Sequence, residues 1–224
     1  MELENLLSYL VRWIHIFAGV TWIGILYYFN FVQTEFFKET DAGAKSSAIS
    51  KLVPRALWWF RYGALLTFIS GLALAGFLAS AINFYIMIGI LMGTLMFLNV
   101  WLIIWPAQQI VIASTDAVIA GGEANPAAAG ALAKAGLASR TNTLFSLPML
   151  FFMGASAHLD GAGRLPMSMD DGVSTLAQVL CIVIILGLQI NAIKGKQGPM
   201  TSIVGVIHCG IALGAVLLLI MQLL

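Results

Sequence analysis

The stretch WIHIFAGVTWIGILYYFNFVQ, residues 13–33, decides the fold class of this chain. It is almost wholly apolar and is as long as the roughly 20 residues that a transmembrane helix requires. It also contains His15 and closes with Asn30 and Gln33, polar groups that lipid hydrocarbon does not solvate. The sequence therefore predicts a membrane-spanning helix that carries an ionisable ring inside the bilayer.

The composition of the whole chain is that of an integral membrane protein. Of its 224 residues, 60% are hydrophobic and 9% are charged, and the mean hydropathy is +0.95. Soluble domains carry about 25% charged residues. A net charge of +1 gives no reason to expect a nucleic acid partner, so the lipid bilayer is the expected partner of most of the surface. Cys181 and Cys209 match no CxxC or CxxCH pattern, so we expect neither a disulfide framework nor a covalently attached haem.

Six apolar runs are long enough to cross a membrane. They cover residues 6–34, 56–80, 82–112, 141–158, 173–193 and 201–224. We therefore expect an all-α integral membrane protein, a bundle of about six transmembrane helices. Residues 1–224 should form a single transmembrane domain, because no connecting segment is large enough for a soluble core of its own.

The distribution of basic residues predicts the orientation. If the N-terminus faces outward, eight of the eleven Lys and Arg side chains fall on the cytoplasmic side, namely Lys38, Lys45, Lys51, Arg55, Lys134, Arg140, Lys194 and Lys196. Cytoplasmic loops are enriched in these residues, so both termini should lie outside. The segment LDGAGRLPMSMDD, residues 159–171, would then be an acidic outer loop. It is either a docking edge for a basic partner such as a cytochrome or a solvated turn.

The three histidines, His15, His158 and His208, all fall within predicted helices. At about 1.5 Å of rise per residue in a core about 30 Å thick, His15 lies about 13 Å and His208 about 20 Å below the outer surface. His158 closes the fourth run near the outer face. Ionisable residues inside a membrane usually mark a functional site. His15 and His208 are close enough in depth to meet one planar cofactor if their helices adjoin.

Haem b is the cofactor that these histidines predict. Histidine commonly holds haem iron in proteins, and two axial histidines make the iron an electron carrier. We predict His15 and His208 as the ligands of the haem iron, with His158 as the other candidate for the second position. Arg12, three residues before His15 on the same helix face, either pairs with a haem propionate or extends to the lipid headgroups. The alternative for the histidines is a hydrogen-bonded, purely structural role.

Other polar and small residues predict contacts between helices. Asn30, Gln33 and Asn99 are expected to bridge helices by hydrogen bonds worth about 1 kcal/mol each. Two glycines of the first run and three of the second permit close approach, either of another helix or of a flat ring. They are Gly19, Gly24, Gly63, Gly71 and Gly76.

Three blocks of sequence, in this order along the chain, carry a family resemblance: WIHIFAGVTWIGILYYFNFVQ at 13–33, IWPAQQ at 104–109 and SRTNTLFSLPMLFFMGASAH at 139–158. Together they resemble the membrane part of the bacterial membrane-bound urate oxidase (urate hydroxylase) family. The resemblance implies a helical domain in the bacterial inner (cytoplasmic) membrane. In that family, this domain is joined to a C-terminal c-type cytochrome outside the membrane, which is thought to receive electrons from urate oxidation.

The sequence departs from this family in one respect, because it contains no CxxCH motif. We therefore expect that the chain lacks the C-terminal cytochrome and does not oxidise urate alone. The expected function is electron transfer by an oxidoreductase-type membrane protein, either to a separate cytochrome c or among the subunits of a respiratory or photosynthetic complex. The alternative is a non-catalytic accessory subunit of such a complex.

A second resemblance involves the first apolar run only. The pattern HIFAGVTWIGILYY, residues 15–28, is similar to the first helix of the membrane protoporphyrinogen oxidase family, whose members bind haem b. That resemblance also implies His15 as an axial ligand. A protoporphyrinogen oxidase-like haem protein is therefore a further alternative.

Overall fold

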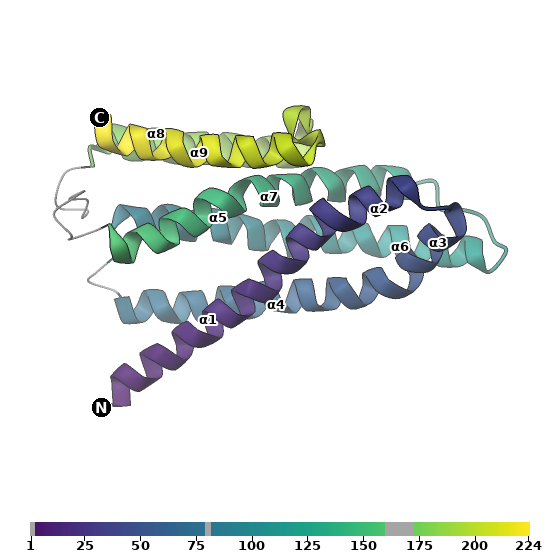
Figure 1. Cartoon of the computed structure of the whole chain (residues 1–224), viewed down its shortest axis with the longest axis horizontal. Coiled ribbons are helices and arrows are strands. Elements are labelled where there is room, and N and C mark those ends of the chain that lie inside the picture. The colour runs from purple at the N-terminus through teal and green to yellow at the C-terminus, as the bar shows by residue number, and fades with distance from the viewer. Residues whose placement is uncertain (1–2, 79–81, 160–172) are drawn as a thin grey trace.

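The computed structural model of the chain describes residues 3–78, 82–159 and 173–224, and helices make up nearly all of them. Figure 1 shows long helices lying side by side, with both chain termini at the same end of the bundle. No strand occurs in the described ranges. The predicted all-α fold class is thereby confirmed.

Three long helical units are each interrupted by a short π-helical turn. The first consists of α1 (Leu3–Tyr27), η1 (Tyr28–Gln33) and α2 (Thr34–Glu39). The second consists of α3 (Ala42–Ser47), η2 (Ala48–Leu52) and α4 (Val53–Leu78), and the third of α5 (Phe84–Asn99), η4 (Val100–Ile104) and α6 (Trp105–Ile119). The remaining elements are α7 (Ala128–His158), α8 (Thr175–Lys194), the 3₁₀ turn η5 (Gly198–Thr201) and α9 (Ile203–Leu223).

Five helical units in the described ranges are long and apolar enough to cross a membrane. They are Leu3–Glu39, Ala42–Phe77, Phe84–Ile119, Thr175–Lys194 and Ile203–Leu223. The remaining predicted span falls on α7, whose polar residues lower its hydropathy. α7 nevertheless runs the length of the bundle beside α5 (Figure 1). A bundle of six spans with both termini outside remains a prediction.

α7 is longer than the fourth predicted span, residues 141–158. It begins at Ala128, so Lys134 and Arg140, which we assigned to a cytoplasmic loop, are helical. The many alanines before Arg140 explain the extension, because alanine has the highest intrinsic helix propensity. Arg140 is also only 4% exposed, and its assignment to an exposed loop is therefore wrong.

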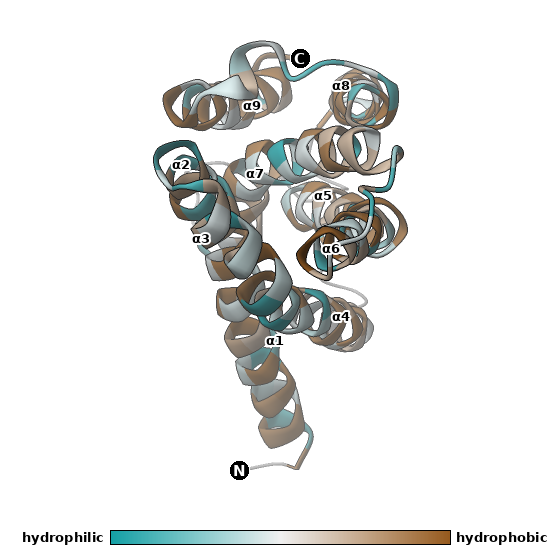
Figure 2. Ribbon diagram, turned by 90° about the vertical axis from the view of Figure 1, so that its right-hand side faces the viewer, coloured by the Kyte–Doolittle hydropathy of each residue, from teal (hydrophilic) through white to brown (hydrophobic). Residues whose placement is uncertain are grey.

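α7 is the central helix of the bundle. It packs against α5, α6 and α9, and less extensively against α8 and α1. In Figure 2, α8 and α9 lie along one edge and α1 and α4 lie toward the opposite edge, with α7 between them. Residues 140–146 of α7, which include most of its polar side chains, are all buried. The polar groups of α7 therefore face other helices.

The contact between α7 and α9 depends on a proline and a glycine. Pro148 lies inside α7 and has no N–H with which to bond the carbonyl of Leu144, four residues earlier. Gly210 of α9 lies against this carbonyl, because a Cβ at position 210 would be 3.0 Å from Leu144 O and 2.6 Å from Leu147 Cδ1. The absent side chain lets the two backbones approach closely.

α1 and α4 also pack closely, along a row of small residues on α4. A Cβ at Gly63 would lie 3.3 Å from the backbone nitrogen of Trp22 and 3.5 Å from Ala18 O. The predicted close approach at Gly63 is therefore confirmed, and the group that approaches is helix α1. The same prediction is wrong for Gly24 and Gly76, since nothing lies within 4 Å of an added Cβ at either position. The predicted acidic docking loop falls almost wholly outside the described residues, which end at Leu159 and resume at Val173.

We expect Gly210→Ala to destabilise the chain, because the added methyl group would meet the Leu144 carbonyl. Overpacking of this kind costs about 1–3 kcal/mol. Thermal unfolding of the purified protein in neutral detergent would measure the loss. Gly187→Ala in α8 is the matched control, since nothing lies within 4 Å of its added Cβ. Equal melting temperatures for the two variants would contradict this account of the α7–α9 contact.

The orientation predicts the behaviour of reporter fusions. A reporter that works only in the cytoplasm should be inactive when fused after Leu224 and active when inserted near Lys45, because the basic residues cluster on the cytoplasmic side. Activity of the Leu224 fusion would place the C-terminus inside and rule out an outward-facing pair of termini.

Candidate functional site

His15 of α1 is bonded to two oxygen atoms of α4. Its Nδ1 lies 2.9 Å from the backbone oxygen of Thr67 and 3.2 Å from Ser70 Oγ. The Thr67 carbonyl can only accept a hydrogen bond. Ser70 directs its own proton to the Leu66 carbonyl at 2.6 Å, so its oxygen is left to accept from His15. Both contacts therefore require that Nδ1 carries the proton.

This tautomer leaves the lone pair of the imidazole on Nε2. Among the described residues, Nε2 of His15 has no hydrogen-bond partner. A histidine that ligates a metal usually donates its other ring N–H to a carbonyl or carboxylate, which fixes the ring and makes the ligand nitrogen more basic. His15 has this arrangement: its N–H is fixed by α4 and its neutral lone pair is free.

Gly71 provides the space for the ring. A Cβ at position 71 would lie 3.0 Å from His15 Cε1 and 3.4 Å from Nδ1. Gly63, Thr67 and Ser70 continue the same face of α4 at helical spacing, and Thr67 bonds back to the Gly63 carbonyl at 2.7 Å. Small residues thus bring α1 near, while hydroxyls and carbonyls on that face provide acceptors.

The other two histidines predicted for the site lie on helices other than α1. His158 is the last residue of α7 and His208 lies on α9, and both side chains are exposed. Each bonds through Nδ1 to the carbonyl four residues earlier, Gly154 at 2.9 Å and Val204 at 2.7 Å. Figure 2 shows α9 and α1 on opposite sides of α7, so the structure does not bring His208 beside His15.

Arg12 lies one turn before His15 and is exposed on α1. It makes no ion pair with any described residue. In residues 3–78, 82–159 and 173–224, no three His, Cys, Asp or Glu side chains gather as a metal-binding group would. The candidate site in a single chain is therefore one imidazole with an accessible lone pair.

A second polar group, which we call the amide cluster, joins three helices and consists of Asn99, Asn142 and Gln189. Asn99 Nδ2 donates to Asn142 Oδ1 at 2.8 Å and to Gln189 Oε1 at 3.0 Å. Gln189 Nε2 donates back to Asn99 Oδ1 at 2.6 Å. Asn142 Nδ2 donates to the Met96 carbonyl at 3.0 Å. All three side chains are buried, so the cluster links α5, α7 and α8.

The first unit joins α7 through further hydrogen bonds. Asn30 lies in the π-helical turn η1 and donates to Ser139 Oγ at 2.8 Å, and Tyr27 bonds to Ser146 at 2.9 Å. The predicted bridging by Asn30 and Asn99 is therefore confirmed. Gln33 is different, because its buried Oε1 has no partner among the described residues.

Sequence reasoning missed most of these partners. Thr67 and Ser70 carry no pattern of their own, because hydroxyls inside helices commonly bond the carbonyl four residues earlier. Gln189 is a polar residue within an apolar run. Its position alone predicts a side chain that faces another helix, since polar side chains inside membrane helices usually face protein. The polar run SRTNTLFS, residues 139–146, predicts the same for α7.

Comparison with known proteins gives one match. A family model described as urate oxidase N-terminal matches residues 76–188, which is half of the chain. The matched segment contains α5, η4, α6, α7 and most of α8. It includes Asn99 and Asn142 of the amide cluster and ends one residue before Gln189. His15 lies before it. No curated protein and no solved structure matches the chain.

We expect Asn99→Leu to destabilise the bundle by about 1–3 kcal/mol, because it leaves amide groups of Asn142 and Gln189 buried without partners. The double variant Asn99→Leu/Gln189→Leu should be less destabilised than Asn99→Leu alone, since one of the two stranded amides is removed with it. Thermal unfolding of the wild type, of Asn99→Leu and Gln189→Leu, and of the double variant in neutral detergent would measure this. A double variant whose loss equals the sum of the single losses would show that the amides do not act as a cluster.

Proposed function

The chain belongs to the urate oxidase N-terminal family, and we propose that it is a multi-pass membrane redox protein that binds haem b through His15. The observation that carries the proposal is the tautomer of His15. Two acceptors of α4 hold Nδ1–H, so the neutral Nε2 is available to a metal.

The residues around His15 suit a histidine that ligates haem iron. A ligating imidazole must be neutral and fixed in orientation, and Thr67 O and Ser70 Oγ supply both conditions. Gly71 leaves room for the ring, and the half-buried position limits the approach of water. When bound, a haem iron would carry electrons if it had two axial ligands, or would bind a small ligand if it had one.

We propose His15 as the one axial ligand that a single chain supplies. His208 and His158 also present an unprotonated Nε2, but on α9 and at the end of α7. Either would serve as the second ligand only across a contact with another chain. Arg12, exposed one turn from His15, is proposed to pair with a propionate carboxylate.

The proposed electron partner is a separate cytochrome c or another subunit of a membrane complex in the bacterial inner membrane. This part of the proposal rests on the family and on the membrane-compatible helices. The alternative, an accessory subunit without a cofactor, would use the same hydrogen bond of His15 for helix packing alone.

The test is the haem content of the purified chain. The wild type should give a Soret band, sharp α and β bands on reduction, and a haem b signal in a pyridine haemochrome assay. His15→Ala should lose most of the haem while still inserting in the membrane, because α1 becomes more apolar. Ser70→Ala should keep Nε2 in place but retain haem about tenfold or more weakly, because one acceptor of Nδ1–H is lost.

His158→Ala is the matched control, because it removes an exposed histidine with the same tautomer from another helix. A His15→Ala protein with a full and spectrally unchanged complement of haem would refute the assignment. A colourless wild type, expressed in cells that make haem, would favour the accessory subunit.

A further inference from the structure

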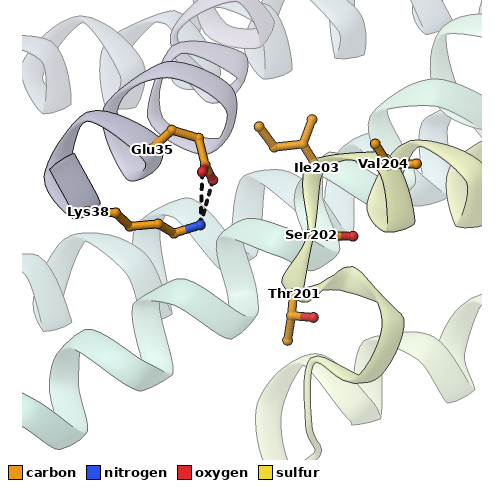
Figure 3. A pocket seen from close by; sticks show the side chains of 6 residues that line it. All are labelled: Glu35, Lys38, Thr201, Ser202, Ile203 and Val204. Carbon is orange, nitrogen blue, oxygen red and sulfur yellow. Dashed lines mark hydrogen bonds and ion pairs between the residues drawn. The ribbon is translucent and has the colours of Figure 1, made fainter.

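The first turns of α4 carry two arginines without an acidic partner. Arg55 is exposed, and Arg61, further along the same helix, is partly buried. Neither takes part in a hydrogen bond or an ion pair among the described residues. Lys38, at the same end of the bundle, differs in this respect, because its Nζ is bonded to both carboxylate oxygens of Glu35, at 2.8 and 2.9 Å (Figure 3). The two arginines of α4 therefore leave positive charge that no described carboxylate balances.

Aromatic rings fix the position of Arg61. Its guanidinium carbon lies 3.8 Å from the centroid of the Trp105 ring, 5.1 Å from that of Trp101 and 4.8 Å from that of Tyr62. A ring attracts a guanidinium through its flat face, whereas the N–H groups lie in the plane and point outward. The rings therefore hold the charge in place without giving its donors an acceptor, and Nε is enclosed without one. The terminal nitrogens of the fork are left to bond a group from outside the chain.

A pocket opens beside these rings, and Arg55 forms part of its wall. The pocket has a volume of about 390 Å³ and is lined by Pro54, Arg55, Trp58 and Trp59. Trp58 connects it to the surroundings of Arg61, since the centroid of its ring lies 5.0 Å from that of Trp59 and 4.8 Å from that of Tyr62. Both guanidiniums thus border one continuous run of rings. We call this group the arginine patch, and it consists of Arg55, Trp58, Trp59, Arg61 and Tyr62.

Apolar side chains continue this face of α4 beyond the arginine patch. Leu66, Ile69 and Leu72 follow Tyr62 at helical spacing, and they are 45%, 54% and 56% exposed. Figure 2 shows α4 at the periphery of the bundle, and Figure 1 shows its first turns toward the end opposite the two termini. The face therefore has a cationic, aromatic head at one end and an exposed apolar stripe behind it.

The arginine patch has the chemistry of a site for a lipid phosphate. A guanidinium presents two parallel N–H groups that match two oxygens of a phosphate. Trp and Tyr rings lie at the level of lipid headgroups in membrane proteins, and anionic lipids are attracted to basic groups at the cytoplasmic surface. A belt of rings alone needs no anion. The two unpaired guanidiniums among the rings are what calls for one.

We propose that the arginine patch binds the headgroup of an anionic phospholipid, whose acyl chains lie along Leu66, Ile69 and Leu72. Arg61, held by its rings, provides the prepositioned fork for the phosphate, and Arg55 provides the second positive charge from the pocket wall. The apolar stripe selects a lipid over a free oxyanion. The site is separate from His15 and does not depend on a bound haem.

The test measures thermal unfolding of the full chain, purified and delipidated in neutral detergent at constant ionic strength. The additions are phosphatidylglycerol in mixed micelles, phosphatidylcholine as the lipid without net charge, and inorganic phosphate. At about a hundred times its dissociation constant, phosphatidylglycerol should raise the melting temperature of the wild type by roughly 5–10 °C. Arg61→Gln and Arg55→Gln should each reduce this rise, measured against the lipid-free form of the same variant, and the double variant should abolish it.

Lys38→Gln is the matched control, because it removes one positive charge from the same end of the bundle, where that charge is already paired with Glu35, and should leave the rise unchanged. If Arg61→Gln fails to fold, Arg61→Lys, which keeps the charge but loses the paired N–H groups, should show a smaller rise than the wild type. An equal rise with phosphatidylcholine or with inorganic phosphate, or a full rise in the Arg55 and Arg61 variants, overturns the proposal.

Discussion

Hydrogen-bonding capacity inside the bundle is the constraint on which the arrangement of helices depends. Neighbouring helices and lipid tails are similarly apolar, so hydrophobic burial does little to select one packing over another. Buried amides do select one packing of the helices. An amide without a hydrogen-bond partner costs free energy, and lipid offers no partner. Asn99, Asn142 and Gln189 satisfy one another only if α5, α7 and α8 stand in one register. The central place of α7 follows from the number of polar groups it brings.

The polar groups of the bundle differ in whether the chain satisfies them. In the amide cluster, donors of one side chain meet acceptors of the next. At His15 the chain supplies acceptors for Nδ1–H and nothing for Nε2. A purely structural histidine would gain stability from a donor to that nitrogen, so the one-sided arrangement is better suited to ligation than to packing.

The sequence predicts the helical class and the apolar runs well, because hydropathy depends on composition alone. It also identifies His15, Asn30 and Asn99, since single polar residues stand out in apolar runs. Depth along a helix, however, carries no information on lateral neighbours. His15 and His208 are similar in calculated depth, yet α7 separates their helices. The start of α7 was missed for a related reason, because an alanine-rich segment with lysine and arginine resembles a loop in hydropathy while favouring a helix in propensity.

The two arginines within the bundle show how strongly the local surroundings decide the state of a charge. Arg61 lies against the faces of Trp105, Trp101 and Tyr62, with its guanidinium carbon 3.8 Å from the centroid of the Trp105 ring. These rings supply negative potential without any anion. Arg140 has no aromatic face within contact distance among the described residues, and the Ser139 oxygen beside it accepts from Asn30. Arg140 is therefore buried without the ring faces that Arg61 has, and without a hydrogen-bonded acceptor among the described residues.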